Sequence, residues 1–127
     1  KLAPMPDPMG TIVRDLKATI SRARHTGIDK SRLAIDPGLG FGKRKEQNSL
    51  IVGRLGQLAA TLDLPIMAGP SRKQFLAHET AEETKFATAA AVAACVLGGA
   101  HIVRVHDVRE MRAAADVADE ILLTQES

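Results

Sequence analysis

Hydrophobic side chains recur at helical spacing in the first part of the chain. Asp7 precedes Pro8, the arrangement of an N-cap residue followed by proline at the first helical position, and Gly27 offers a stop. The apolar positions between them are Ile12, Val13, Leu16 and Ile20. This pattern predicts a helix that begins at about residue 8 and ends before Gly27.

Helical spacing returns three more times. One stretch, 50–62, carries leucine and isoleucine on one face, and an alanine-rich stretch covers about 84–97. A last helix is expected after Asp107, where Glu110 stands three residues on, as in a capping box. Its expected inner face consists of Val108, Met111, Ala115, Ala118 and Ile121 or Leu122.

Short apolar runs at 33–35, 65–68 and 101–105 separate these helices and predict strands. The resulting order, αβαβαβα, implies parallel strands covered by helices, an α/β class. A complete doubly wound sheet has about five strands, and a (β/α)8 barrel has eight in about 250 residues. Three strands therefore favour an incomplete barrel, with residues 1–127 as one partial domain. Its open side is expected to expose Ile35, Met67 and Val103.

Composition and charge exclude several classes of protein. The chain has 127 residues, with 17 basic and 15 acidic side chains. Its formal net charge of +2 is too small to attract nucleic acid strongly. Trp and Tyr are absent, which disfavours an aromatic stacking platform. No apolar run approaches the ~20 residues of a membrane span. Cys95 is the single cysteine and lies in an alanine run, so we expect a buried small side chain in a reducing, cytoplasmic compartment.

Polar clusters follow each of the three predicted strands. They are Asp36-Pro37-Gly38-Leu39-Gly40-Phe41-Gly42-Lys43, Gly69-Pro70-Ser71-Arg72-Lys73 and Arg104-Val105-His106-Asp107. Because parallel strands place their carboxyl ends on one rim, where α/β proteins bind ligands, these clusters should converge. His25, His78 and His101 have no such setting and are interpreted as surface residues.

The glycine-rich loop 38–42 matches neither common nucleotide motif. Three residues separate Gly38 from Gly42 where a phosphate loop needs four, and Lys43 stands where the dinucleotide fingerprint needs its third glycine. The loop is either a flexible strand-to-helix turn or a close backbone approach to a flat ligand. Asp36 is either a turn residue or an acceptor for paired N–H donors, as on an aminopyrimidine ring.

Cationic side chains dominate the other two clusters. Ser71 is expected to be an N-cap, with Arg72 and Lys73 in the first helical turn, where each cation opposes the helix dipole by roughly 0.3–1 kcal/mol. That cost favours an anionic or carbonyl-rich ligand there. Arg104 and His106 alternate along their strand and share one side of it, which suits either a phosphate or a structural network.

These motifs resemble those of dihydropteroate synthase, a folate-pathway enzyme with a (β/α)8 TIM barrel. The matching stretches are 35–43, 69–75 and 104–108, and the run 88–100 before the last strand is also similar. The resemblance extends over nearly the whole chain, but over only about the carboxyl-terminal half of the family's length. It implies that the chain carries strands six to eight of the barrel with their helices.

The resemblance also implies an activity and roles for individual residues. The family's enzyme joins 6-hydroxymethyl-7,8-dihydropterin diphosphate to p-aminobenzoate, giving dihydropteroate and diphosphate. The implied pterin contacts are Asp36, Gly69 and Lys73. The implied p-aminobenzoate contacts are Gly40, Phe41, Arg72 and Gln74, and the implied diphosphate contacts are Arg104 and His106. Lys73, Arg104 and His106 are the implied catalytic residues, and Gln74 stands where the family usually has Ser or another small residue.

Cofactors and partners follow from the same resemblance. Magnesium is expected, with its ligand outside this segment, together with sulfonamide inhibitors and a homodimer through the carboxyl-terminal helices. Because the family's first five strands are absent, we expect the chain alone to be inactive. The alternatives are a non-catalytic pterin-binding relative or scaffold subunit, and a methyltransferase domain that passes a methyl group from a folate to a corrinoid. The latter needs neither the Ser-Arg-Lys set nor the Arg-x-His set.

Overall fold

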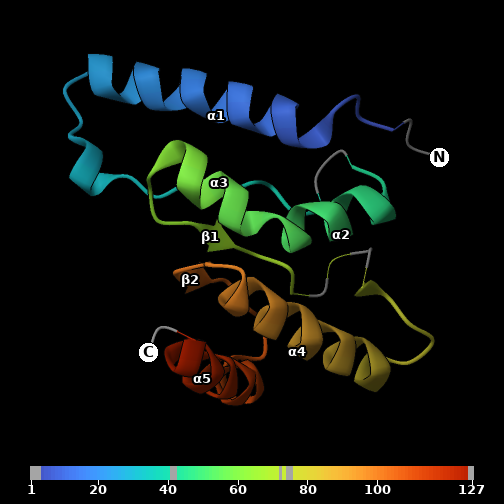
Figure 1. The fold of residues 1–127 in the computed structure, drawn as a ribbon. Helices are drawn as coiled ribbons and strands as arrows, with labels where there is room; N and C mark the ends of the chain where they lie inside the picture. The colour runs from blue at the N-terminus through green and yellow to red at the C-terminus, as the bar shows by residue number, and fades with distance from the viewer. Residues whose placement is uncertain (1–3, 41–42, 72, 74–75, 126–127) are drawn as a thin grey trace.

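Helices form most of the chain, and two short strands lie between them (Figure 1). The structure is a computed structural model that describes residues 4–40, 43–71, 73 and 76–125. The elements are α1 (Pro8–His25), the 3-10 helix η1 (Lys30–Arg32), α2 (Lys45–Gly53), α3 (Leu55–Leu62), β1 (Met67–Ala68), α4 (Ala81–Leu97), β2 (Ile102–Val103) and α5 (Val108–Gln125).

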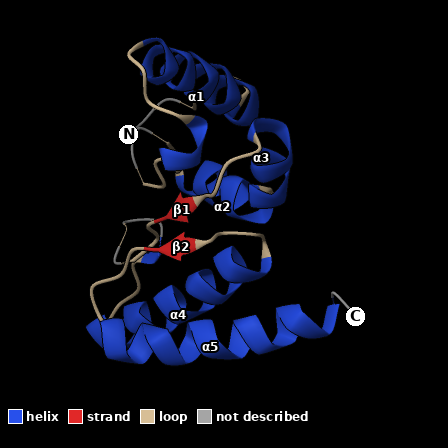
Figure 2. Ribbon diagram, turned by 90° about the vertical axis from the view of Figure 1, so that its left-hand side faces the viewer, coloured by secondary structure: helices blue, strands red, loops and turns tan. Residues whose placement is uncertain are grey.

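The strands lie between two helical layers. Helices α1, α2 and α3 cover one side, and α4 and α5 cover the other (Figure 2). Strand β1 pairs in parallel with β2, with Met67 opposite Ile102, and Ile35 forms a parallel bridge to Ile66. The three predicted strand segments are therefore parallel neighbours in chain order, as the α/β pattern predicts.

The strands are shorter than predicted. The segment 33–35 contributes only the bridge at Ile35, and the segment 101–105 contributes only β2. A strand grows by pairing along both edges of its backbone. Among the described residues, Ile35 and β2 each have a pairing neighbour on one side only, which limits the ladder at both ends of the sheet.

Helix α1 begins as the sequence predicts. The Asp7 carboxylate accepts a hydrogen bond from the Gly10 N–H at 3.2 Å, and Pro8 occupies the first helical position. Past the carboxyl end of the helix, Gly27 has a φ of +95°, a left-handed conformation that glycine adopts without strain. The expected cap, start and stop of this helix are confirmed.

Two other helices differ from their predictions. The single helix expected over 50–62 is wrong, because Arg54 (φ −122°, ψ 21°) leaves helical geometry and separates α2 from α3. Gly53, which disfavours helix formation, directly precedes this break. Helix α4 begins earlier than expected because Thr80 and Glu83 form a capping box, in which the Thr80 hydroxyl accepts from the Glu83 N–H at 3.0 Å.

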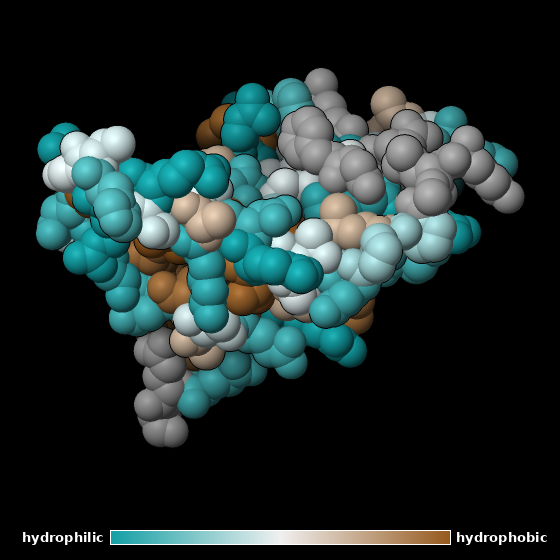
Figure 3. Space-filling view, turned by 90° about the horizontal axis from the view of Figure 1, so that it is seen from above, coloured by the Kyte–Doolittle hydropathy of each residue, from teal (hydrophilic) through white to brown (hydrophobic). Residues whose placement is uncertain are grey.

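The hydrophobic core joins the strands to helices from both layers. Its buried members are Ile12, Ile35, Leu39, Ile51, Leu55, Leu58, Leu62, Leu64, Ile66, Ala68 and Cys95. The expected exposure of Ile35 is wrong, because its side chain points into this core and is only 5% exposed. Met67 is half-buried on the opposite face of β1 from the core residues Ile66 and Ala68, whereas Val103 pairs with Ala68 and is half-buried on the same face as the core. Seen from the α1 side, the surface is mainly hydrophilic, with hydrophobic atoms gathered in one hollowed area (Figure 3).

Helix α5 packs against α4 through one narrow face. Met111 and Ala118 are buried there, as predicted. The expected inward position of Val108 is wrong, since its side chain is 65% exposed. Ala115 is half-buried, and of the two alternatives near the helix end Leu122 is half-buried while Ile121 is 45% exposed. A single helical neighbour covers less of the circumference of α5 than the sequence pattern assumes.

Candidate functional site

The first polar cluster, which contains the glycine-rich loop, begins directly after the bridge at Ile35. The Asp36 carboxylate accepts a hydrogen bond from the Gly38 N–H at 2.8 Å, so Asp36 is a turn residue, one of its two expected roles. Its side chain is also exposed, and a carboxylate can accept further donors. Gly38 and Gly40 have φ values of +74° and +86°, so the loop path requires glycine at both positions.

Two polar side chains form hydrogen bonds to this loop, those of Lys43, just before α2, and of Asn48, in its first turn. The Asn48 Oδ1 atom accepts from the Gly40 N–H at 2.7 Å, and Asn48 Nδ2 donates to the carbonyl oxygens of Lys43 and Arg44 at 3.3 and 3.1 Å. The Lys43 ammonium donates to the Gly38 carbonyl at 2.6 Å. Burial lowers the pKa of Lys43, and the nearby negative charge of Asp36 opposes that shift.

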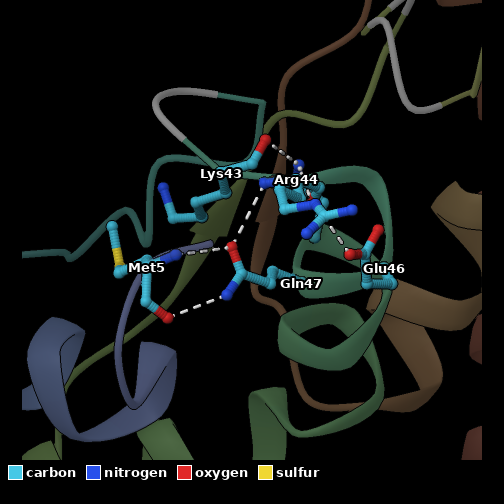
Figure 4. A network of polar contacts seen from close by, with 6 residues as sticks. Met5, Lys43, Arg44, Glu46 and Gln47 are labelled. Carbon is cyan, nitrogen blue, oxygen red and sulfur yellow. Dashed lines mark hydrogen bonds and ion pairs between the residues drawn. The ribbon is translucent and has the colours of Figure 1, made fainter. Parts of the chain in front are cut away.

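Gln47 ties the segment before α1 to the same helix start (Figure 4). The Met5 N–H donates to Gln47 Oε1 at 3.0 Å, and Gln47 Nε2 donates to the Met5 carbonyl at 2.8 Å. The Arg44 N–H also donates to Gln47 Oε1, at 3.2 Å, while the Arg44 guanidinium pairs with Glu46. These contacts were not predicted, because a polar residue in a first helical turn gives no sequence signal for a partner far along the chain.

Ser71 belongs to a turn and not to a helix. Ser71 lies in a turn whose Lys73 N–H donates to the Pro70 carbonyl, and Lys73 is not helical, so the expected N-cap at Ser71 and helical turn at Lys73 are wrong. Arg72, expected in the same helical turn, lies outside the described residues. The Ser71 hydroxyl instead accepts from the His106 N–H at 3.0 Å and lies 2.9 Å from His106 Nδ1.

The three strand ends meet at one edge of the sheet. A Cβ atom at Gly40 would lie 2.9 Å from Lys73 Cδ, so the lysine stem crosses the glycine-rich loop at close range. A Cβ atom at Gly69 would lie 3.7 Å from Arg104 Cβ. Together with the bond from Ser71 to His106, these contacts join all three polar clusters. Phe41, Arg72 and Gln74, also predicted for this site, lie outside the described residues.

The remaining candidate side chains lie apart from this edge or are buried. The rings of His25, His78 and His101 contact nearby backbone, and all three residues are exposed, as interpreted from the sequence. Cys95 is completely buried, and burial raises the pKa of its thiol to about 12, which excludes an activated nucleophile. This confirms the expected buried small side chain.

Within residues 4–40, 43–71, 73 and 76–125, no group of three His, Cys, Asp or Glu side chains could hold a metal ion. No helix of the described chain combines the length and apolarity needed to cross a bilayer.

Comparison with known proteins gives consistent matches. A family model described as "Pterin binding enzyme" matches residues 5–106. The dihydropteroate synthase of Synechocystis sp. is 36% identical over 119 residues, an alignment that covers 91% of this chain and 41% of that protein. The chain therefore spans about two fifths of the length of this curated relative.

Solved structures agree with the sequence matches. Dihydropteroate synthase from Xanthomonas albilineans in complex with 7,8-dihydropteroate superposes with a TM-score of 0.86 at 35% identity, covering 92% of this chain and 47% of that one. The Xanthomonas albilineans protein has also been solved with 4-aminobenzoic acid. The Yersinia pestis dihydropteroate synthase, solved as a sulfonamide drug complex, matches with a TM-score of 0.86 at 31% identity, covering 94% of this chain and 44% of that one. The expected partial α/β barrel is confirmed by these matches.

Proposed function

This chain belongs to the pterin binding enzyme family, and we propose that it forms the carboxyl-terminal part of a dihydropteroate synthase barrel, with residues 1–127 as one partial domain. The proposed reaction condenses 6-hydroxymethyl-7,8-dihydropterin diphosphate with p-aminobenzoate to give dihydropteroate and diphosphate. The observation that carries the proposal is the meeting of three polar strand ends at one edge of the sheet. Because the chain spans less than half of its relatives, the proposed activity requires the remainder of the barrel.

We assign the pterin to Asp36, Gly69 and Lys73. The Asp36 carboxylate is exposed and fixed by the Gly38 N–H, so it can accept paired donors from an aminopyrimidine edge. Gly69 lies beside Arg104, 3.7 Å from Arg104 Cβ to a Cβ placed at Gly69, and its pterin contact is assigned by family resemblance.

We assign p-aminobenzoate to the neighbourhood of Gly40, with Phe41, Arg72 and Gln74 as further contacts by family resemblance. The close passage of Lys73 over Gly40 supports a shared wall between this subsite and the pterin subsite. Sulfonamides, which mimic p-aminobenzoate, are the proposed inhibitors. Replacing Gln74 by Ser is expected to change sulfonamide affinity more than pterin affinity, and equal shifts in the two dissociation constants would place Gln74 elsewhere.

We assign diphosphate departure to Arg104 and His106. In the proposed step the bond from the pterin methylene carbon to oxygen breaks and its electron pair leaves with diphosphate. The arylamine nitrogen then forms the new C–N bond and loses a proton to solvent. Donors on the departing anion stabilise its charge. The Ser71 hydroxyl supports this role by fixing the His106 ring and backbone, while Lys73 contacts the ring system that becomes electron-poor.

The residues that the structure describes do not by themselves form a magnesium site. The described ranges hold no suitable cluster of three His, Cys, Asp or Glu side chains, so we derive no step through a metal ion here. Any magnesium in the proposed enzyme would need ligands from the remainder of the barrel. The cytoplasmic location expected from the single cysteine stays a prediction.

We propose a homodimer through the outward face of α4. Phe86 and Leu97 are 66% and 38% exposed, and the exposed small residue Ala90 lies between them at helical spacing. Exposed large apolar side chains gathered on one face are typical of an interface. Sedimentation should show a mass that rises with concentration, and Phe86→Asp should abolish the rise while Lys85→Ala leaves it unchanged. A monomer at every concentration would contradict this surface.

A joined barrel tests the proposed reaction. The joined barrel is a fusion in which the amino-terminal strands of the Xanthomonas albilineans relative precede this chain. Its formation of dihydropteroate is measured. Arg104→Ala removes charge-assisted hydrogen bonds worth roughly 1.5–3 kcal/mol each, so kcat/KM should fall by about tenfold or more. Asp36→Asn should instead raise KM for the pterin substrate, while the exposed Arg109→Ala serves as the control. The site assignment fails if both variants retain full activity. A joined barrel that binds the dihydropterin diphosphate without turnover would favour the non-catalytic pterin-binding alternative.

A further inference from the structure

A buried amide lies beneath the glycine-rich loop. Asn48 is 2% exposed, and its side chain uses both polar atoms, accepting from the Gly40 N–H and donating to the Lys43 and Arg44 carbonyls. Burying an amide is unfavourable unless its polar atoms find partners. Because Gly40 has a left-handed φ, its N–H needs a partner outside a regular ladder, and Asn48 supplies one.

A buried ammonium group lies under the preceding part of the same loop. Lys43 is 7% exposed, and its Nζ atom donates to the Gly38 carbonyl at 2.6 Å. The N–H of the same glycine donates to Asp36. Gly38 is thus held through its carbonyl by a cation and through its amide by a carboxylate, which fixes the direction of the Asp36 side chain.

We infer that Lys43 and Asn48 are positioning residues that separately fix Gly38 and Gly40 of the glycine-rich loop. Lys43 fixes Gly38 and, through it, the carboxylate of Asp36. Asn48 fixes Gly40 at the point where Lys73 crosses the loop. The functional part of this inference rests on the proposed synthase function, in which Asp36 faces the pterin and Gly40 faces p-aminobenzoate.

This arrangement has separable consequences for the two substrates. Loss of the Asn48 amide releases Gly40 while the bond from Lys43 to Gly38 remains, so arylamine binding should weaken more than pterin binding. Loss of the Lys43 ammonium releases Gly38 while the bond from Asn48 to Gly40 remains, so pterin binding should weaken more. A merely structural role would lower the stability of the protein without weakening the binding of one substrate more than that of the other.

Hydrogen exchange tests the loop anchors in the 127-residue chain without any ligand. Asn48→Leu retains the side-chain volume and removes the polar contacts, while Asn48→Ala is a second variant in case leucine does not fit. The Gly40 amide should exchange about fivefold faster in either variant, as expected for one lost hydrogen bond. Ser49→Ala, an exposed neighbour on the same helix, should leave that rate unchanged. Unchanged exchange at Gly40 in both Asn48 variants would overturn the inference.

Steady-state kinetics in the joined barrel test the division between substrates. Asn48→Leu should raise KM for p-aminobenzoate and the dissociation constant of a sulfonamide by about fivefold, with KM for the pterin substrate within about twofold. Lys43→Met should raise the pterin KM by about tenfold or more and leave the p-aminobenzoate KM within about twofold, with the exposed Lys45→Met as its control. Equal effects on both substrates, or a loosened loop without any effect on either, would overturn the positioning roles. Failure of the unsubstituted joined barrel to form dihydropteroate would refute the proposed function, and the exchange experiment would still decide whether Asn48 anchors the loop.

Discussion

Stability in alkaline solution should depend on the buried thiol of Cys95. Its side chain is fully buried between the two helical layers, and burial raises its pKa from the ordinary 9.0 to about 12. Above pH 9 the unfolded chain therefore loses this proton while the folded chain keeps it. The unfolded state then binds fewer protons, so the free energy of unfolding falls by at most about 1.4 kcal/mol per pH unit until the folded thiol also ionises. The loss should reach about 2 kcal/mol near pH 10.5.

Urea denaturation of the unsubstituted chain and of Cys95→Ala, each followed from about pH 8 to 10.5, isolates this contribution. Other groups titrate in both proteins, so the difference between the two stability profiles reports Cys95 alone. The unsubstituted chain should lose stability more steeply above pH 9. Parallel profiles would refute the reasoning. So would labelling of the native thiol near pH 8 at the rate of a free cysteine, because a buried, protonated thiol reacts only when the structure opens.

Four further substitutions test the fold by urea denaturation. Leu58→Ala removes a fully buried core side chain and should lower the free energy of unfolding by about 2–5 kcal/mol; a loss under about 1 kcal/mol would contradict its burial. Thr80→Ala removes the capping box of α4 and should cost about 0.5–2 kcal/mol, with no loss expected if the cap does not form. Gly40→Ala should lower the free energy of unfolding by at least about 1 kcal/mol, because Gly40 has a left-handed φ and contacts Lys73. Gly53 lies in a helix with open space around it, so Gly53→Ala should raise the free energy of unfolding by about 0.5–1 kcal/mol. Equal effects of the two glycine substitutions would contradict the loop geometry.

The sequence predicts elements well where local chemistry decides them. Asp7 and Pro8 define the start of α1 through a cap and a fixed φ, both readable from neighbouring residues. The Thr80 and Glu83 capping box was equally readable and would have corrected the start of α4. The break at Arg54 and the exposure of Val108 depend instead on how helices pack on their neighbours, which periodicity alone does not specify.

Some features of the candidate site are likewise predictable from the sequence, and others depend on contacts between distant residues. Parallel strands bring their carboxyl ends together by geometry, so the meeting of Gly40 with Lys73 and of Ser71 with His106 follows from the alternating pattern. In place of the expected helix cap, the Ser71 hydroxyl has a partner at a distant strand end, and no local propensity encodes that choice. The anchoring contact of Asn48 also depends on a left-handed loop conformation that the sequence permits but does not specify.

The order of strand pairing bears on how the chain is made. Ile35 pairs with Ile66 in the next strand segment, and β1 then pairs with β2, so each pairing uses the segment that follows directly in the chain. During synthesis, the layer of α1, α2 and α3 can close around the Ile35 bridge before α4 and α5 have left the ribosome, because amino-terminal parts of a chain emerge and fold first. Until β2 arrives, β1 presents an open edge to the surrounding medium, a state in which unpaired strands are prone to aggregate. In the interval between translation of residues 68 and 102, the edge of β1 that later pairs with β2 is therefore open to wrong partners.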